Sequence, residues 1–243
     1  MIMMMIIIIL FGTPQRLKSV SGLTSVNVAD SVIQLSGSVK ILGATLDSSL
    51  TMGPHTKTLS KSCFHHIRSF RQIRSSMDHS TAVSVALALV SSRLDYVNSI
   101  LSGSPLKHIA RLQRAQHALA RVVLQERSRA RSAPLMQQLH WLPIDWRIRF
   151  KLATLTYKAL QTGRPPYLAD LIHFHTTSKS TRSSSTQLLF VPCHNLSFGS
   201  RSFRVSAPKV WNTLPLHIRK SQSLFTFRRY LKTHYFQLAY PAT

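Results

Sequence analysis

The acidic side chains are considered first, because two-metal phosphoryl transfer and phosphodiester hydrolysis require clustered carboxylates. The chain carries seven acids, and no two of them lie within ten residues of each other: Asp30, Asp47, Asp78, Asp95, Glu126, Asp145 and Asp170. We therefore expect them to act as helix caps and ion-pair partners. We expect no carboxylate metal site, and we do not expect this chain to be an enzyme.

Zinc and nucleophilic chemistry have equally weak signals. Cys63 with His65 and His66, and Cys193 with His194, form short clusters, but a zinc finger needs a cysteine pair at short spacing and a matching second pair. Cys63 falls on the apolar face of a predicted helix, which favours a core position. No Ser/His/Asp spacing stands out, although triad members need not be adjacent in sequence. We expect no cofactor and no small-molecule substrate.

The charge balance is the strongest signal in the composition. Lys and Arg total 31 against seven acids, a formal net charge of +24. Such a surface repels itself unless a polyanion neutralises it, and nucleic acid is the expected polyanion. An anionic membrane surface, an acidic protein or a merely solvated basic surface are the alternatives. With only two cysteines no disulfide framework is expected, which indicates an intracellular protein of the nucleus or cytoplasm.

Basic residues recur on the polar faces of three predicted helices, opposite their apolar faces. The helices span about 54–74, the residues after Ser104-Pro105, and about 224–237. The candidate nucleic-acid-binding residues on them are Lys57, Lys61, Arg68, Arg71, Arg111, Arg114, Arg121, Arg228, Arg229 and Lys232. We expect these helices to present cations outward to RNA or DNA phosphates, without sequence specificity and with strong salt sensitivity. Phe64 is expected to pack against a neighbour, with stacking on a base as the alternative.

The remaining pattern predicts a mainly α-helical bundle with a small N-terminal β element and a short C-terminal β-hairpin. Short strands and turns are expected over 6–50, with a strand ending in a turn at Leu42-Gly43. Further helices are expected over 80–101, 145–161 and 167–172. The first should bury a face of Val83, Leu87, Val90, Leu94, Val97 and Leu101. Trp141 and Trp211 are expected to pack in the core. A strand at 188–191 is expected to pair near Phe203. The predicted regions are 1–50, a helical region 51–175, a Ser/Thr-rich linker 176–186, and 187–243.

The first eleven residues form an unbroken apolar run, MIMMMIIIILF. This run is shorter than the roughly 20 residues that a membrane-spanning helix needs. Its β-branched content favours a buried strand, which becomes an aggregation hazard if it lacks sheet neighbours. A basic membrane-surface protein anchored by this run is the alternative.

Several segments, taken in order, resemble one known family. They include Phe11-Gly12-Thr13-Pro14, Leu42-Gly43 with Leu46-Asp47, Ser92-Arg93-Leu94-Asp95-Tyr96 with Asn98, Leu112-Gln113-Arg114-Ala115-Gln116, Leu139-His140-Trp141-Leu142-Pro143, Tyr157-Lys158-Ala159-Leu160, Pro166-Tyr167-Leu168, Arg182-Ser183-Ser184, Ala207-Pro208 with Trp211-Asn212, and Phe227 with Leu231-Lys232. Each piece alone is weak, but their order and spacing together are specific. The chain resembles the C-terminal region of reverse transcriptases from jockey-like non-LTR (LINE) retrotransposons.

The resemblance implies a place for each part within the parent polymerase. Residues 6–50 resemble the last strands of the palm, residues 51–125 resemble the thumb, and the rest resembles a C-terminal extension. The family's catalytic acidic motifs lie upstream of the matching region, so no catalytic residue carries over. The resemblance therefore implies a truncated, non-catalytic fragment that binds nucleic acid, with a non-functional, pseudogene-like fragment as the alternative.

Overall fold

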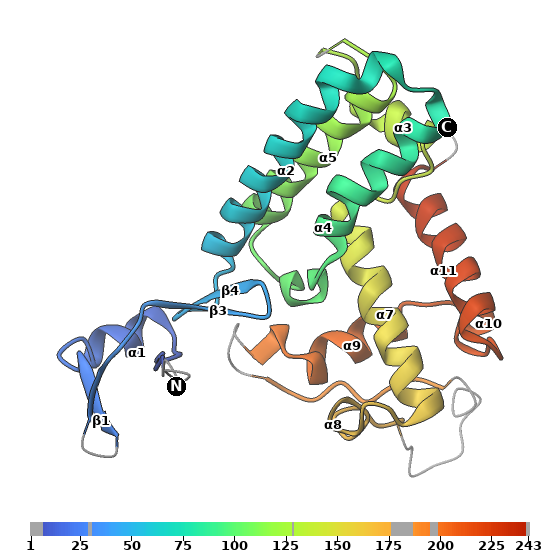
Figure 1. Ribbon diagram of the computed structural model, residues 1–243. Coiled ribbons are helices and arrows are strands. Elements are labelled where there is room, and N and C mark those ends of the chain that lie inside the picture. The colour runs from blue at the N-terminus through green and yellow to red at the C-terminus, as the bar shows by residue number, and fades with distance from the viewer. Residues whose placement is uncertain (1–6, 29–30, 128, 176–186, 195–198, 242–243) are drawn as a thin grey trace, which may run out of the picture.

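The structure is a computed structural model that describes residues 7–28, 31–127, 129–175, 187–194 and 199–241. It is mainly α-helical, as predicted, with small β elements near the N-terminus (Figure 1). The helical elements are α1 (Pro14–Ser19), α2 (Gly53–Ile73), η1 (Arg74–Ser76), α3 (His79–Ala86), η2 (Leu87–Ser91), α4 (Ser92–Asp95), η3 (Asn98–Leu101), α5 (Leu106–Val123), α6 (Ser132–Gln138), α7 (Ile144–Thr162), α8 (Pro166–Ala169), η4 (Gly199–Arg201), α9 (Phe203–Asn212), α10 (Leu216–Arg219) and α11 (Leu224–Ala239). The strands are β1 (Ser25–Val28), β2 (Ser31–Gln34), β3 (Ser38–Ile41) and β4 (Ala44–Asp47).

The N-terminal β element consists of two antiparallel hairpins, β1–β2 and β3–β4. Leu42 and Gly43 form the β3–β4 turn with φ of 45° and 80°, the left-handed conformation that two-residue hairpin turns require. This turn was predicted, but helix α1, which begins after the capping residue Thr13, was not. The buried strand predicted for the apolar N-terminal run is wrong for residues 7–11, where a single bridge joins Ile8 to Leu35 and Ile7, Leu10 and Phe11 are exposed. Residues 1–6 lie outside the described residues.

The larger core lies between α2 and α5, which pack along their lengths (Figure 1). Their predicted apolar faces meet there: Cys63, Ile67 and Phe70 of α2 and Leu112 and Leu119 of α5 are at most 2% exposed. The two helices run parallel, because contacts join their first turns at Thr56 and their last turns at Val123. This parallel arrangement places the basic faces of both helices side by side.

The predicted helix over 80–101 is interrupted, and its buried face differs from the predicted one. Val83 is half-buried and Leu87 is 42% exposed, whereas Ala82, Ala86, Val90 and Leu94 form the core face. The reason is the π-helical turn η2, which takes up an extra residue, so that the buried positions before it lie one residue earlier than regular helical spacing back from Val90 and Leu94 predicts. Helical structure then ends at Asp95, and Val97 adopts a left-handed conformation before η3.

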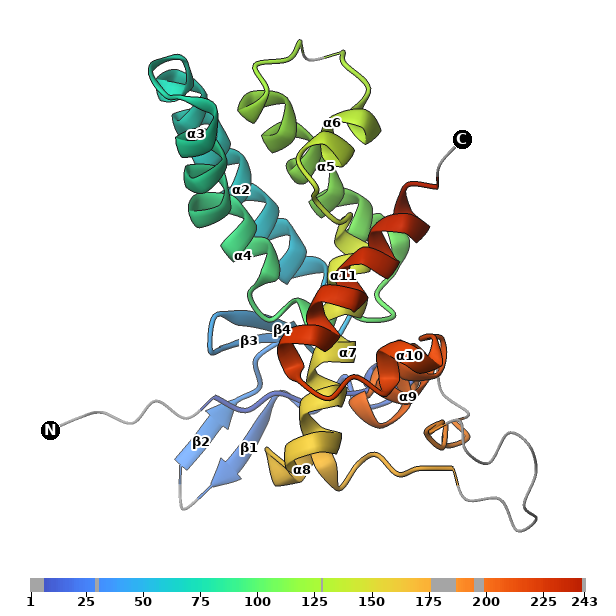
Figure 2. The same cartoon turned by 90° about the vertical axis from the view of Figure 1, so that its right-hand side faces the viewer.

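A second core lies between α7, α9 and α11, with both α9 and α11 packed against α7 (Figure 2). The Phe227 ring stacks on Tyr157 with centroids 4.3 Å apart, and Trp211 is 2% exposed, as expected of a core anchor. The predicted C-terminal hairpin is wrong. Phe203 begins helix α9, and Leu189 instead bridges to Phe174. Helix α6 was also not predicted.

One hydrogen bond joins distant parts of the chain. Arg201 Nη1 donates to the carbonyl of Leu50 at 2.8 Å, linking η4 to the loop before α2. Gly103 allows this approach, because a Cβ there would lie 3.0 Å from Arg201 Cγ. The predicted linker 176–186 lies outside the described residues. Among the described helices, none has the length and apolar character to cross a membrane.

Candidate nucleic-acid interface

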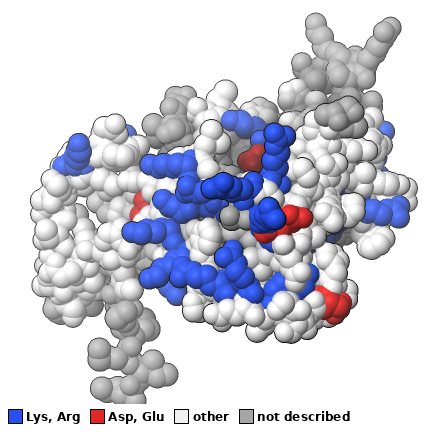
Figure 3. Space-filling view, turned by 90° about the horizontal axis from the view of Figure 1, so that it is seen from above, with Lys and Arg blue, Asp and Glu red and all other residues white. Residues whose placement is uncertain are grey.

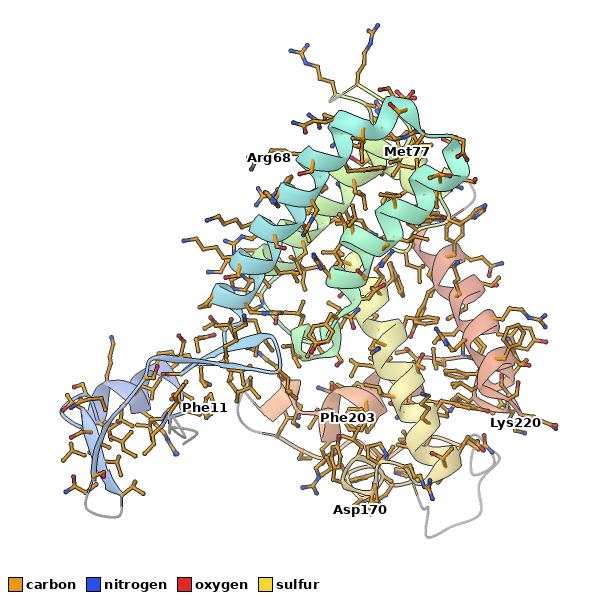
Figure 4. The ribbon with its side chains drawn as sticks, viewed as in Figure 1. Phe11, Arg68, Met77, Asp170, Phe203 and Lys220 are labelled. Carbon is orange, nitrogen blue, oxygen red and sulfur yellow. The ribbon has the colours of Figure 1, made fainter. Side chains whose placement is uncertain are left out.

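The basic row of α2 is exposed, as its sequence spacing predicted. Lys57, Lys61, Arg68 and Arg71 all face solvent, and at 100° per residue they fall within about 80° of the helix circumference. Figure 4 shows Arg68 projecting from α2 away from the other helices. None of these four side chains forms an ion pair with a described residue. Their charges are therefore available to an external anion.

The basic row of α5 is only partly available. Arg114 is exposed, but Arg111 and Arg121 are half-buried, which corrects the expectation that all three face outward. Arg121 donates to the Ala130 carbonyl at 3.1 Å and to Ser132 Oγ at 2.6 Å. It thereby closes the loop between α5 and α6. A guanidinium is long enough to reach back across such a loop, which helical spacing alone does not reveal.

The rows of α2 and α5 meet along one seam. At its lower end Arg111 Nη1 donates to Thr56 Oγ1 at 3.3 Å, and Thr56 Oγ1 lies 3.3 Å from His108 Nδ1. At its upper end Arg71 and Arg121, from different helices, line the same hollow of about 560 Å³. Figure 3, which views the molecule from above, shows Lys and Arg side chains gathered in the middle of the surface on that side.

Arg74 also lines this hollow and was missed by the sequence analysis. Its side chain is buried, with Nε donating to the Val123 carbonyl and Nη1 to the Met77 carbonyl, both at 2.8 Å. These hydrogen bonds connect the end of α2 to the end of α5. Nothing in the local sequence distinguishes it from its exposed neighbour Arg71. Glu126 is the acid at this hollow.

The basic row of α11 lies apart from the other two. Arg228, Arg229 and Lys232 are exposed, but their helix packs along α7, on the opposite side of Figure 1 from α2. Arg228 lies 5.9 Å from the centre of the Phe150 ring, and Arg229 lies 5.3 Å from that of Tyr230. The structure therefore joins two of the three predicted basic rows and leaves the third separate.

Four of the acids serve the structural roles expected of them. Asp47 accepts hydrogen bonds from the amides of Thr51 and Met52 ahead of α2, and Asp78 caps α3. Hydrogen bonds from Ser80 and Thr81 lower the pKa of Asp78. Asp95 and Asp145 pair with Arg147 and Arg149, each at 2.8 Å. No cluster of three metal-ligating side chains occurs within the described ranges, and Asp30 lies outside them.

Other predicted positions agree with a packing role. Cys63 is fully buried, and burial raises the pKa of its thiol to about 11, so it stays protonated near neutral pH. Phe64 packs against the larger core from a half-buried position, which favours packing over base stacking. Trp141 is buried in the same core.

Comparison with known proteins finds no relative of this chain. The chain matches no protein family, no curated protein and no solved structure. The geometry of the basic rows and the sequence resemblance are therefore what bears on the function of this chain.

Proposed function

We propose that this chain binds the phosphate backbone of RNA or DNA, without catalysis, through one basic face formed by α2 and α5. The face comprises Lys57, Lys61, Arg68, Arg71 and Arg114, and we call it the α2/α5 face. The observation that carries the proposal is that two parallel helices place these exposed cations on one side, without ion-pair partners in the described chain. The half-buried Arg111 and Arg121 support this face. Arg111 hydrogen-bonds to Thr56 of α2, and Arg121 hydrogen-bonds to the loop between α5 and α6 and to the first residue of α6.

The sequence resemblance gives the same proposal a biological context. In that context the chain corresponds to the C-terminal region of a non-LTR retrotransposon reverse transcriptase, and α2 to α5 correspond to a thumb that holds template and primer. Nucleic-acid binding is then the role of a thumb-like region, which needs none of that enzyme's acidic motifs among its own residues. A map of transcripts around this reading frame tests this part separately.

Binding through phosphates predicts a steep dependence of affinity on salt. Each neutralised phosphate contributes about −0.9 to the slope of log affinity against log salt for duplex DNA and about −0.7 for single strands. Five available cations therefore predict a slope of roughly −4. Fluorescence anisotropy with labelled RNA and DNA across a salt series measures this slope directly.

Two triple variants test the place of binding. K57Q/K61Q/R68Q removes three charges from the α2/α5 face, and K151Q/K158Q/K220Q removes three exposed charges elsewhere. We expect the first variant to reduce the salt slope by about three and the second to change it by less than about one. Circular dichroism confirms that both stay folded. Equal losses from the two variants would contradict a localised face and leave only diffuse charge attraction.

A further inference from the structure

A second cavity lies on the other side of α2 from the α2/α5 face. It has a volume of about 460 Å³, and it is bounded by the β3–β4 hairpin, the first half of α2 and α4. Tyr96 fixes this boundary, since its hydroxyl donates to the Leu42 carbonyl at 2.7 Å. Gly43 lets the hairpin approach closely, because a Cβ there would lie 3.2 Å from the Tyr96 ring.

His55 lines this cavity and carries an unpartnered donor. The residue is only 7% exposed, and its Nδ1 accepts a hydrogen bond from the Thr45 amide at 3.4 Å. In the neutral ring the proton therefore sits on Nε2. That nitrogen is buried and has no hydrogen-bond partner among the described residues. A buried donor without an acceptor is costly, which indicates that an external acceptor belongs here.

Arg93 and Lys40 give the cavity a positive charge. The Nε of Arg93 is buried and, within the described chain, has no acceptor. Lys40 lines the opposite wall, on β3. No Asp or Glu lines the cavity in the described ranges, and Asp95, the acid closest to Arg93 in sequence, pairs with Arg147. Two cations and a neutral imidazole donor thus surround a space without a compensating anion.

We propose that this cavity binds a single phosphate group, held by Lys40, His55 and Arg93. A phosphate presents several strong acceptor oxygens, so it can accept from His55 Nε2 and Arg93 Nε once a small side-chain rotation opens these two buried nitrogens to the cavity, while the Lys40 ammonium neutralises its charge. The hydroxyls of Thr58, Ser62 and Ser92 also line the cavity. At 100° per residue, His55 and Ser62 point about 140° to 160° away from Lys57 on α2. The site is therefore separate from the α2/α5 face and does not depend on it.

The test follows the imidazole nitrogens of His55 by two-dimensional NMR on the full chain during titration with inorganic phosphate. Sodium chloride at matched ionic strength corrects for general charge screening. We expect a saturable shift of the Nε2 signal with phosphate alone. Absence of a saturable shift in the unmodified protein overturns the proposal, and this measurement requires no variant to fold.

Variants assign the donors. R93Q removes both the charge and the Nε donor, and we expect it to weaken phosphate binding on the order of tenfold, the effect of one charge-assisted hydrogen bond. R93K restores the charge without the Nε donor and should recover only part of the affinity. The matched control K158Q removes a distant exposed charge and should retain the wild-type value. Equal losses in R93Q and K158Q also overturn the proposal.

Two ligands separate the possible sources of the phosphate. A nucleoside monophosphate presents a free phosphomonoester, whereas an oligonucleotide without terminal phosphates presents only phosphodiesters. If only the monophosphate shifts His55, the site receives a free phosphate group. If the oligonucleotide also shifts it, and K57Q/K61Q/R68Q retains that shift, the site holds a strand phosphate independently of the α2/α5 face.

Discussion

The basic rows of α2 and α11 are alike in composition but differ in their surroundings. In both, Lys and Arg follow an apolar stripe around a helix. The cations of α2 lie beside a second basic helix, α5, and one of them, Arg71, lines a hollow together with Arg121 of α5. Two of the cations of α11 instead lie near aromatic rings, on a helix whose main contacts are with α7 and α10. Charge along a helix therefore identifies a candidate, and the neighbouring helix determines whether a binding face forms.

The largest expected effect concerns the packing that holds α11. Phe227 is fully buried against Tyr157 and Trp211. Replacing Phe227 with Ala should destabilise the protein by about 3–5 kcal/mol, because it removes a large ring and leaves a cavity. Urea denaturation measures this loss. RNA affinity under conditions where the variant remains folded should be unchanged, and a large loss of affinity there would show that α11 contributes to binding.

A smaller effect separates two arginines at the same end of α2. Arg74→Gln should destabilise the fold by about 2 kcal/mol, since it removes the guanidinium that donates hydrogen bonds to the carbonyls of Val123 and Met77. Arg68→Gln should change stability by less than about 0.5 kcal/mol, because its side chain is exposed. RNA binding should respond in the opposite order. If both variants lose stability equally, Arg68 has a structural contact and does not belong to the face.

The α2/α5 region should also be the more acid-sensitive one. Burial lowers the pKa of His55, and it lowers that of His108, assisted by Lys107 and Arg111. A histidine with a lowered folded pKa binds its proton mainly after unfolding. Its contribution is therefore complete above the unfolded value of about 6.5 and is lost as the pH falls from there toward the folded pKa.

Urea midpoints between pH 7.5 and 5.5, in buffers without phosphate, test this sign. We expect the midpoint to fall with pH and the fall to be reduced in His108→Gln. The matched variant His234→Gln, on α11, should reduce it less, since His234 is half-exposed. A midpoint that rises on acidification would contradict the assigned direction.

The smallest expected effect is the most direct test of the comparison. R228Q/R229Q/K232Q removes as much charge as K57Q/K61Q/R68Q, but it should change the slope of RNA affinity against salt by less than about one. Anisotropy across the same salt series measures it. A slope change of about three would place the nucleic acid on α11 as well and would remove the distinction between the two rows.

Sequence periodicity predicted the parts of the fold in which one face of a long helix is buried. The apolar stripes of α2 and α5 were found because each is regular over several turns. The buried face of 80–101 was predicted wrongly, because the spacing of apolar residues does not reveal the π-helical turn at η2. Helix α9 was missed because Pro208, which lacks an amide proton and usually ends helices, lies inside it.

The candidate sites divide in the same way. The exposed row Lys57, Lys61, Arg68 and Arg71 follows from helical spacing alone. The structural roles of Arg74 and Arg121 depend on carbonyl groups brought close by tertiary packing. The same is true of His55 and Arg93, whose unpartnered nitrogens become apparent only when the hairpin, α2 and α4 are in place.

The hydrogen bond from Arg201 to Leu50 has a consequence for the order in which the chain can fold during synthesis. Its two ends are 151 residues apart, so the loop that leads into α2 cannot acquire this contact until most of the polypeptide has left the ribosome. Until then, helices of the bundle that have already formed lack the hydrogen bond from Arg201 that anchors this loop. A nascent chain arrested before residue 201 should therefore be more readily cleaved by protease around Leu50 than one arrested after release of α11.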